Sequence, residues 1–261
     1  MTGSVLDKFR LDGKRAMITG SGRGLGRQMA LALSDAGASL VLVGRGAESI
    51  EATAGEIAER GGLAETIVAD VTKTDACTRA CEAALANGPV DILINNVGGR
   101  SLNIPIAETS AAQWREGMAL NLDHYFLTTR LIGAAMIAAG NGGRIINMGS
   151  ISGMIVNRDV GGRHYETAKA AVMHFTKAVA VDWAKYGITA NAISPGLFMT
   201  DANRRWEEID RTPIDSFVSG VPMGRPGEPE EIGPLAVYLA SPASSYVTGA
   251  SFVIDGGYTA W

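Results

Sequence analysis

Short apolar runs rich in valine, isoleucine and leucine alternate along this chain with longer stretches rich in alanine. The alternation begins near Lys14 and continues toward the end of the chain, without internal repeats or a linker rich in proline or serine. Continuous apolar runs are typical of strands that helices cover on both faces of a sheet. The pattern therefore predicts an α/β fold built on a doubly wound parallel sheet, with helices on both faces.

The runs predict a seven-stranded sheet, with strands over residues 15–19, 39–43, 65–69, 92–95, 143–148, 189–193 and 251–254. In such folds ligands bind outside the carboxyl ends of the strands, so the residues that follow each strand are the first candidates for a site. The segment 198–225 breaks the alternation with scattered charges and prolines. It is interpreted either as a substrate lid or as an ordinary surface excursion.

Length and composition indicate one globular domain over residues 1–261, because 46% of the residues are hydrophobic. The net charge of -4 and the scattered basic residues argue against a nucleic-acid partner. The apolar run 131–139 is too short to cross a bilayer, so we expect no membrane association and a cytoplasmic protein. Cys77 and Cys81 are expected to share one helix face in a reducing compartment, with neither a disulfide nor a metal site.

A glycine-rich turn follows the first predicted strand and precedes a helix. It reads Thr19, Gly20, Ser21, Gly22, Arg23, Gly24, Leu25, Gly26. Glycines allow backbone to approach a pyrophosphate closely, and the helix N-terminus offers free amides and a partial positive charge. The spacing T-G-x-x-x-G-x-G differs from the common dinucleotide motif G-x-G-x-x-G. Taken alone, the turn predicts a phosphate cradle for some nucleotide, or only a tight turn.

The end of the second predicted strand bears on the choice of nicotinamide cofactor. An acid there would bind the ribose hydroxyl of NAD, but the chain reads Val43, Gly44, Arg45. A second cation, Arg23, lies inside the glycine-rich turn. Arginine forks match phosphate oxygens, so the pair predicts NADP(H), with NAD(H) as the alternative cofactor. The competing interpretation is that each arginine belongs to a solvated surface.

Tyr165 and Lys169 are candidates for proton transfer. They lie four positions apart in a segment that continues as an alanine-rich helix, so both lie on one helix face. A neighbouring ammonium favours phenolate, and we therefore expect Lys169 to lower the pKa of Tyr165. The spacing alone is common on solvated helices, and its weight comes from the other motifs.

With these features the chain resembles the short-chain dehydrogenase/reductase family over nearly its whole length. Residues 19–26 are similar to the family's glycine motif, and Tyr165 with Lys169 forms its Y-x-x-x-K motif. Further matches, in chain order, are Asp70 with Val71, Asn95 with Asn96, Val97 and Gly98, then Asn121, Ser150, Pro195 with Gly196, and Thr200. The segments 247–249 and 255–257 are also typical of the family. Val97 replaces the family's alanine, and its extra bulk is expected to narrow the site.

The resemblance implies a single-domain Rossmann fold and reversible hydride transfer between NADP(H) and a carbonyl or secondary alcohol. It also implies that Asp70 and Val71 contact adenine, and that the segment containing Pro195, Gly196 and Thr200 borders the nicotinamide. Asn96, Val97 and Gly98 are expected to bind the cofactor as well. The implied catalytic residues are Asn121, Ser150, Tyr165 and Lys169, with Lys169 also holding the nicotinamide ribose. The family's C-terminal tail often joins a neighbouring subunit, so we expect a homotetramer.

Two serines compete for the catalytic position. The family's serine usually lies thirteen residues before the tyrosine, which selects Ser152. Position at the end of the fifth predicted strand selects Ser150 and implies a loop about two residues longer than usual. Strand ends vary less than loop lengths, so Ser150 is preferred and Ser152 is interpreted as a turn residue.

The substrate is harder to predict, because loops build the pocket in this architecture. Residues 149–158 look like those of polyol and sugar-acid members such as sorbitol and gluconate 5-dehydrogenases. Arg100, Arg158, Arg204 and Arg205 are candidates for binding a carboxylate, or belong to the solvated surface. A reductase of 3-oxoacyl thioesters is the alternative within the family. A nucleotide-binding sensor without turnover is the alternative from another class.

Overall fold

The computed structural model describes residues 4–158 and 160–261. One seven-stranded sheet organises them, in the strand order β3-β2-β1-β4-β5-β6-β7, and every neighbouring pair is parallel. The strands are β1 (Arg15–Thr19), β2 (Ser39–Gly44), β3 (Ala64–Val68), β4 (Ile92–Asn95), β5 (Gly143–Met148), β6 (Ile188–Pro195) and β7 (Ser251–Ile254). The predicted sheet is confirmed.

Three strands differ from the predicted ranges. β2 ends one residue later than expected, at Gly44. β3 begins and ends one residue earlier than expected. β6 is longer than predicted at both ends, because neighbours on its two sides continue the ladder: Ile188 lies opposite Gly143 of β5, and Pro195 lies opposite Ile254 of β7. All residues of β6 are buried, as expected for a strand covered on both faces.

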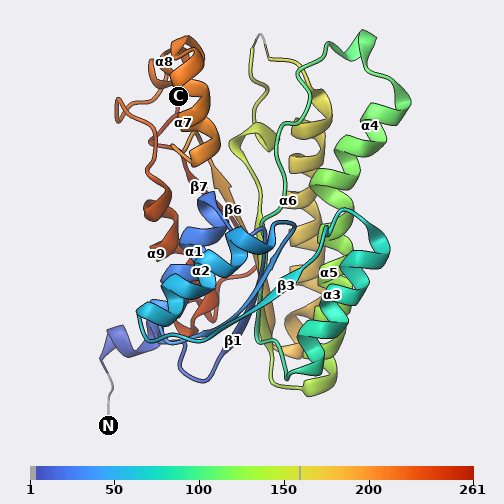
Figure 1. The fold of residues 1–261 in the computed structure, drawn as a ribbon, viewed down its shortest axis with the longest axis vertical. Helices are drawn as coiled ribbons and strands as arrows, with labels where there is room; N and C mark the ends of the chain where they lie inside the picture. The colour runs from blue at the N-terminus through green and yellow to red at the C-terminus, as the bar shows by residue number, and fades with distance from the viewer. Residues whose placement is uncertain (1–3, 159) are drawn as a thin grey trace.

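Helices cover both faces of the sheet (Figure 1). On one face lie α1 (Gly24–Asp35), α2 (Ala47–Glu59) and α9 (Gly233–Ala240), and on the other lie α3 (Thr74–Ala86), α5 (His124–Ala139) and α6 (Arg163–Trp183). Each layer buries its own apolar cluster against the strands. Cys77 and Cys81 are buried together on the face of α3 that packs against the sheet, which confirms that they share one helix face.

The remaining helices lie mainly in the segments that connect these strands and helices. α4 (Ala111–Met118) runs through a π-helical turn, Ala119–Asp123, into α5. Short 3-10 helices span Val5–Phe9, Ile106–Glu108, Ile151–Gly153, Ala184–Tyr186, Pro229–Ile232 and Pro242–Ser244. Among the described residues, no helix is long and apolar enough to cross a membrane.

The segment 198–225 contains α7 (Asp201–Ile209) and α8 (Thr212–Val218). Its first residue, Phe198, is buried and pairs with Gly227. Phe217 of α8 stacks on Tyr258, with ring centroids 4.2 Å apart, which attaches the segment to the C-terminal residues. Figure 1 shows α7 and α8 above the carboxyl ends of β6 and β7. Its role as a lid stays a prediction.

The order of the strands places the site. β1 to β3 extend the sheet in one direction, and the chain then crosses back so that β4 lies on the other side of β1. The loops after β1 and β4 therefore diverge and leave a crevice at the carboxyl ends of these strands, where doubly wound sheets bind their ligands.

Candidate active site

A cleft of ≈ 660 Å³ lies at this crevice. Seventeen of the residues predicted to bind a cofactor line it: Gly20, Gly22, Arg23, Gly24, Leu25, Gly26, Arg45, Asp70, Val71, Asn96, Val97, Gly98, Tyr165, Lys169, Pro195, Gly196 and Thr200. Ser21 does not line the cleft, because it is buried beneath the glycine-rich turn and its carbonyl accepts a hydrogen bond from Thr53 at 3.2 Å.

Two glycines of the turn, Gly20 and Gly26, leave no space for a side chain. Gly20 has φ of 70°, in the left-handed region. A Cβ on Gly26 would lie 2.2 Å from the carbonyl oxygen of Gly20, so the first turn of α1 packs directly on the strand end. The Asn96 amide donates to the carbonyls of Thr19 and Gly20, both at 3.1 Å, and fastens the turn to the end of β4. The N-terminus of α1 consequently faces the cleft, which suits a phosphate.

Charged residues lie at the end of the cleft next to the glycine-rich turn. Arg23 and Arg45 are both exposed there, and neither forms an ion pair within residues 4–158 and 160–261. Asp70 accepts hydrogen bonds from the Thr72 amide at 3.1 Å and hydroxyl at 2.7 Å. Burial opposes ionisation of Asp70, but these bonds and the Arg45 charge outweigh it and hold the pKa of Asp70 below its usual value. Asp70 is therefore a fixed carboxylate acceptor.

Tyr165 lies at the other end of the cleft, on the first turn of α6. Burial raises the pKa of Tyr165 above that of a free phenol, while a hydrogen bond with Ser150 and the charge of Arg100 act in the opposite direction. The Arg100 Cζ is 5.0 Å from the centroid of the Tyr165 ring. Tyr165 is thus a protonated acid whose phenolate two neighbouring groups stabilise.

Lys169 shares the helix face with Tyr165 but donates elsewhere. Its ammonium is 5.9 Å from the Tyr165 ring centroid, and it hydrogen-bonds the Tyr125 hydroxyl at 3.0 Å and the Met148 carbonyl at 2.7 Å. Burial lowers the pKa of Lys169 to about 7. Lys169 is not among the groups that lower the pKa of Tyr165, because a lysine with a pKa of about 7 is neutral at the pH where a phenol titrates.

Asn121 lies in the π-helical turn, a feature that often occurs at functional sites. It is fully buried, and its amide group donates to the carbonyls of Gly99 at 3.1 Å and Gly117 at 3.0 Å. Its carbonyl oxygen accepts from the Gly99 amide at 2.8 Å. In this structure Asn121 fixes the loop after β4 and places that loop beside Lys169, which lies close to Gly98.

The two competing serines have different surroundings. Ser150 lies two residues after the end of β5, lines the cleft and acts to lower the pKa of Tyr165. Its oxygen accepts from the Ser152 amide at 3.1 Å, so its own proton is left to donate. Ser152 does not line the cleft, and its hydroxyl accepts a hydrogen bond from the side-chain amide of Asn157 at 3.0 Å. The geometry favours Ser150, and the assignment stays a prediction.

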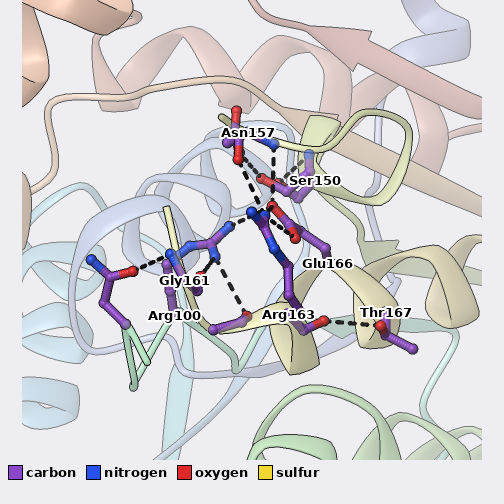
Figure 2. Close-up of polar contacts among 10 residues, drawn as sticks. Arg100, Ser150, Asn157, Gly161, Arg163, Glu166 and Thr167 are labelled. Atoms are coloured by element: carbon purple, nitrogen blue, oxygen red, sulfur yellow. Dashed lines mark hydrogen bonds and ion pairs between the residues drawn. The ribbon is translucent and has the colours of Figure 1, made fainter. Parts of the chain in front are cut away.

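Three residues near Tyr165 and Lys169 have roles that the motifs did not indicate. Arg100 and Glu166 belong to a polar network around the first turn of α6 (Figure 2). Tyr125 is fully buried and donates to the Met148 carbonyl at 3.0 Å while it accepts from Lys169. Glu166 stands inside the Y-x-x-x-K motif at a position where the motif specifies no residue. Only Arg100 could be singled out from the sequence, as a cation after a strand end.

Replacement of Lys169 by methionine is expected to stabilise the protein at neutral and acidic pH. An unfolded lysine titrates at its ordinary value of 10.5, whereas the pKa of folded Lys169 is about 7. Between these values the unfolded chain binds a proton that the folded chain lacks, so the stability of the wild type rises with pH across this window. Below pH 7 the cost of the buried charge is complete and amounts to a few kcal/mol.

Urea unfolding from pH 6 to pH 10 measures this effect. The advantage of Lys169→Met over the wild type should shrink steadily as pH rises through the window. Lys177→Met, an exposed substitution on the same helix, is the matched control and should show no such trend. A Lys169→Met variant that is less stable at every pH would show instead that the two hydrogen bonds of the ammonium outweigh its burial.

Comparison with known proteins agrees with the motifs. The family model described as Enoyl-(Acyl carrier protein) reductase matches residues 20–259. A galactitol 2-dehydrogenase (L-tagatose-forming) of Cereibacter sphaeroides is 43% identical over 253 residues, which cover 97% of this chain and 98% of that protein.

Solved structures extend the agreement to the backbone. A short-chain type dehydrogenase/reductase from Mycobacterium marinum matches with a TM-score of 0.92 at 40% identity, covering 98% of this chain and 99% of that one. A gluconate 5-dehydrogenase from Burkholderia cenocepacia, crystallised with NADP and tartrate, matches with a TM-score of 0.91 at 37% identity, covering 99% and 100%. These likenesses hold over nearly the whole length and confirm the resemblance: the chain belongs to the short-chain dehydrogenase/reductase family and is an oxidoreductase enzyme of that type.

Proposed function

We propose that this enzyme transfers hydride between NADP(H) and a small polyol or keto sugar, interconverting a secondary alcohol and a carbonyl group. One observation carries the proposal: Tyr165 and Ser150 lie together in the same cleft as the glycine-rich turn. The turn and the N-terminus of α1 suit the pyrophosphate, Arg23 and Arg45 suit a 2'-phosphate, and Asp70 with Val71 suits adenine. NADP(H), when bound, accepts or supplies the hydride.

The residues of the chain handle the proton and the orientation of the substrate. In reduction, Tyr165 donates its proton to the substrate oxygen, on which negative charge develops. In oxidation, its phenolate removes the proton of the alcohol. Ser150 donates a hydrogen bond to the same oxygen and so fixes its direction. Lys169 holds the nicotinamide ribose, and Asn121 holds the loop that Lys169 packs against.

The substrate class rests on the relatives. The galactitol dehydrogenase acts on a polyol by its name, and the gluconate dehydrogenase structure contains tartrate, a hydroxy acid. Residues 149–158, which resemble those of polyol and sugar-acid enzymes, lie between the end of β5 and α6 in this structure. Loops of this kind set the shape of the pocket, so they carry the choice of substrate.

Activity on a substrate panel tests the proposal. NADPH oxidation and NADP+ reduction are followed with ketoses, keto sugar acids, polyols, cyclic ketones and 3-oxoacyl thioesters, and Tyr165→Phe serves as the blank. Turnover that depends on Tyr165 with a polyol or keto sugar is expected. Turnover confined to 3-oxoacyl thioesters would replace the substrate class. Tight cofactor binding without turnover on any compound would favour a nucleotide-binding sensor.

The preference for NADP(H) is expected to depend on Arg45. Arg45→Asp should lower the ratio of NADPH to NADH in kcat/KM by about a hundredfold, because a charge-assisted contact is lost and a carboxylate suited to the ribose hydroxyl replaces it. Steady-state kinetics with both cofactors measure the ratio. Arg79→Asp, an exposed charge reversal on α3 outside the cleft, is the matched control. An unchanged ratio in Arg45→Asp would remove Arg45 from the cofactor site.

The proposal extends to the organisation of the protein. We propose one oxidoreductase domain in which residues 198–225 close over the substrate, since Thr200, Asp201 and Asn203 line the cleft. A homotetramer is proposed from the family resemblance, and light scattering checks its mass. A cytoplasmic location suits the buried free thiols of Cys77 and Cys81.

A further inference from the structure

Arg100 is bound so that its guanidinium stays over the ring of Tyr165. Figure 2 shows the polar contacts that hold Arg100. It follows β4 and the Asn95 to Gly99 segment in the chain. Its Nη1 donates to the carbonyls of Gly161 and Gly162, and its Nη2 donates to the Glu166 carboxylate at 3.4 Å. Only 20% of its side chain is exposed. Bonds to two carbonyls and a carboxylate leave the guanidinium few other orientations.

Glu166 connects this arginine to the loop that precedes α6. Its side chain is 7% exposed. Its carboxylate accepts hydrogen bonds from the Arg163 guanidinium at 2.7 and 2.9 Å and from the backbone amide of Asn157 at 3.2 Å. Two guanidinium groups thus share one buried carboxylate. Arg163 also donates to the Asn157 carbonyl at 3.1 Å, so it fastens the loop without reaching the tyrosine ring.

We propose that Arg100 is a positioning residue for proton transfer: its guanidinium, held over the Tyr165 ring by Gly161 and Glu166, stabilises the Tyr165 phenolate that removes the proton when an alcohol is oxidised. A cation over an aromatic face attracts the ring, and the attraction grows when the ring bears negative charge. The inference rests on the proposed function, in which Tyr165 exchanges the proton.

The other charged and titratable groups around Tyr165 are less well placed to stabilise its phenolate. The ammonium of Lys169 is 5.9 Å from the ring centroid and donates to Tyr125 and Met148, whereas the Arg100 Cζ is 5.0 Å from it. Burial and the charge of Arg100 lower the pKa of His164, which keeps this neighbour neutral at pH 7. The groups on the elements packed here are Arg100 after β4, Tyr125 on α5, and Arg163, His164, Glu166 and Lys169 on α6.

A purely mechanical role for Arg100 is the competing explanation, because the same bonds join the loop after β4 to the loop before α6. The two explanations differ in their dependence on charge. A mechanical role predicts similar losses for every variant that breaks the network. An electrostatic role predicts that removing Arg100 and removing the charge of Glu166 change phenolate formation in opposite directions.

The test measures the pH profile of kcat for alcohol oxidation in Arg100→Gln, Arg100→Lys, Glu166→Gln and Arg163→Gln. Arg100→Gln should move the ascending limb to higher pH and reduce the rate on that limb by about threefold to tenfold, with KM little changed. Arg100→Lys should restore much of the wild-type profile. Glu166→Gln, which keeps an acceptor oxygen, should move the limb to lower pH. Arg163→Gln is the matched control within the same network and should move the limb less than Arg100→Gln does.

A second readout needs no substrate. The phenolate absorbance of each variant is titrated and the curve of the same protein with Tyr165→Phe is subtracted, which leaves the titration of Tyr165 alone. Shifts of opposite sign for Arg100→Gln and Glu166→Gln support the inference. Equal shifts for Arg100→Gln and Arg163→Gln, or shifts of one sign for Arg100→Gln and Glu166→Gln, would overturn it. Absence of turnover in the wild type would refute the proposed function alone, since the absorbance titration would still test Arg100.

Discussion

Replacement of Tyr165 by phenylalanine is expected to lower kcat by about two to four powers of ten while NADPH still binds. The substitution removes one oxygen from a residue at the substrate end of the cleft and leaves its ring in place beneath Arg100. The substrate oxygen then has no acid to receive a proton from in reduction, and the alcohol has no base in oxidation. Ser150 can still orient the oxygen, which accounts for residual turnover.

Two measurements separate this loss from general damage. NADPH binding, followed by quenching of tryptophan fluorescence, should change little, because the glycine-rich turn proposed to bind the phosphates lies after β1 and not on α6. Tyr186→Phe is the matched control: its ring is 41% exposed and does not line the cleft, and this variant should keep wild-type turnover. Full activity in Tyr165→Phe would reject proton transfer by this residue and with it the proposed mechanism.

Strand ranges were predicted correctly where apolar residues are contiguous, and burial on both faces was not sufficient. β1 and β4 each contain three contiguous apolar residues, and their ranges were correct, whereas polar residues interrupt the wholly buried β6 and its ends were wrong. β3 is an edge strand, and Thr66 and Val68 are exposed there, so its sequence mixes polar with apolar residues. The weaker pattern explains the error of one residue at each end of β3.

In the candidate site, contacts between residues close together in the sequence were predictable, whereas contacts between distant segments were not. Glycine spacing predicted the turn after β1, because the close approach of Gly26 to Gly20 involves one strand end and the helix that follows it. Lys169 was expected to act on Tyr165 because a helix brings positions i and i+4 together. Its actual partner, Tyr125, is 44 residues away in the sequence, on another helix. Spacing identifies which residues share a face, but it does not identify which element packs against that face.

The contacts of Arg100 could not be predicted from sequence spacing either. It is 61 residues from Gly161, and no periodic pattern relates the loop after β4 to the loop before α6. The sequence indicated a cation after a strand end and suggested a carboxylate ligand for it. The structure instead places Glu166 of this chain against the guanidinium and Tyr165 beneath it. A charged residue that appears available in the sequence is here committed to a neighbour within the protein.

Replacement of Ser150 by alanine is expected to lower kcat by about two to three powers of ten. In the proposed mechanism its hydroxyl donates to the substrate oxygen, and in this structure Ser150 also acts to lower the pKa of Tyr165. Both effects favour the charge that develops in the transition state, so the loss should fall mainly on kcat rather than KM. Steady-state kinetics on the substrate that the panel identifies measure the effect, and thermal unfolding shows whether the fold is intact.

Ser152→Ala is the matched comparison, because it removes the same hydroxyl two residues later from a buried serine outside the cleft. This variant loses the hydrogen bond from Asn157 at 3.0 Å, which should cost about 1 kcal/mol of stability, while turnover stays close to that of the wild type. If Ser152→Ala abolished turnover and Ser150→Ala did not, the family's usual spacing would be the better guide and the assignment to the strand end would be wrong. Loss of activity in Ser150→Ala alone would establish that the catalytic serine is set by the end of β5, whatever the length of the loop that follows.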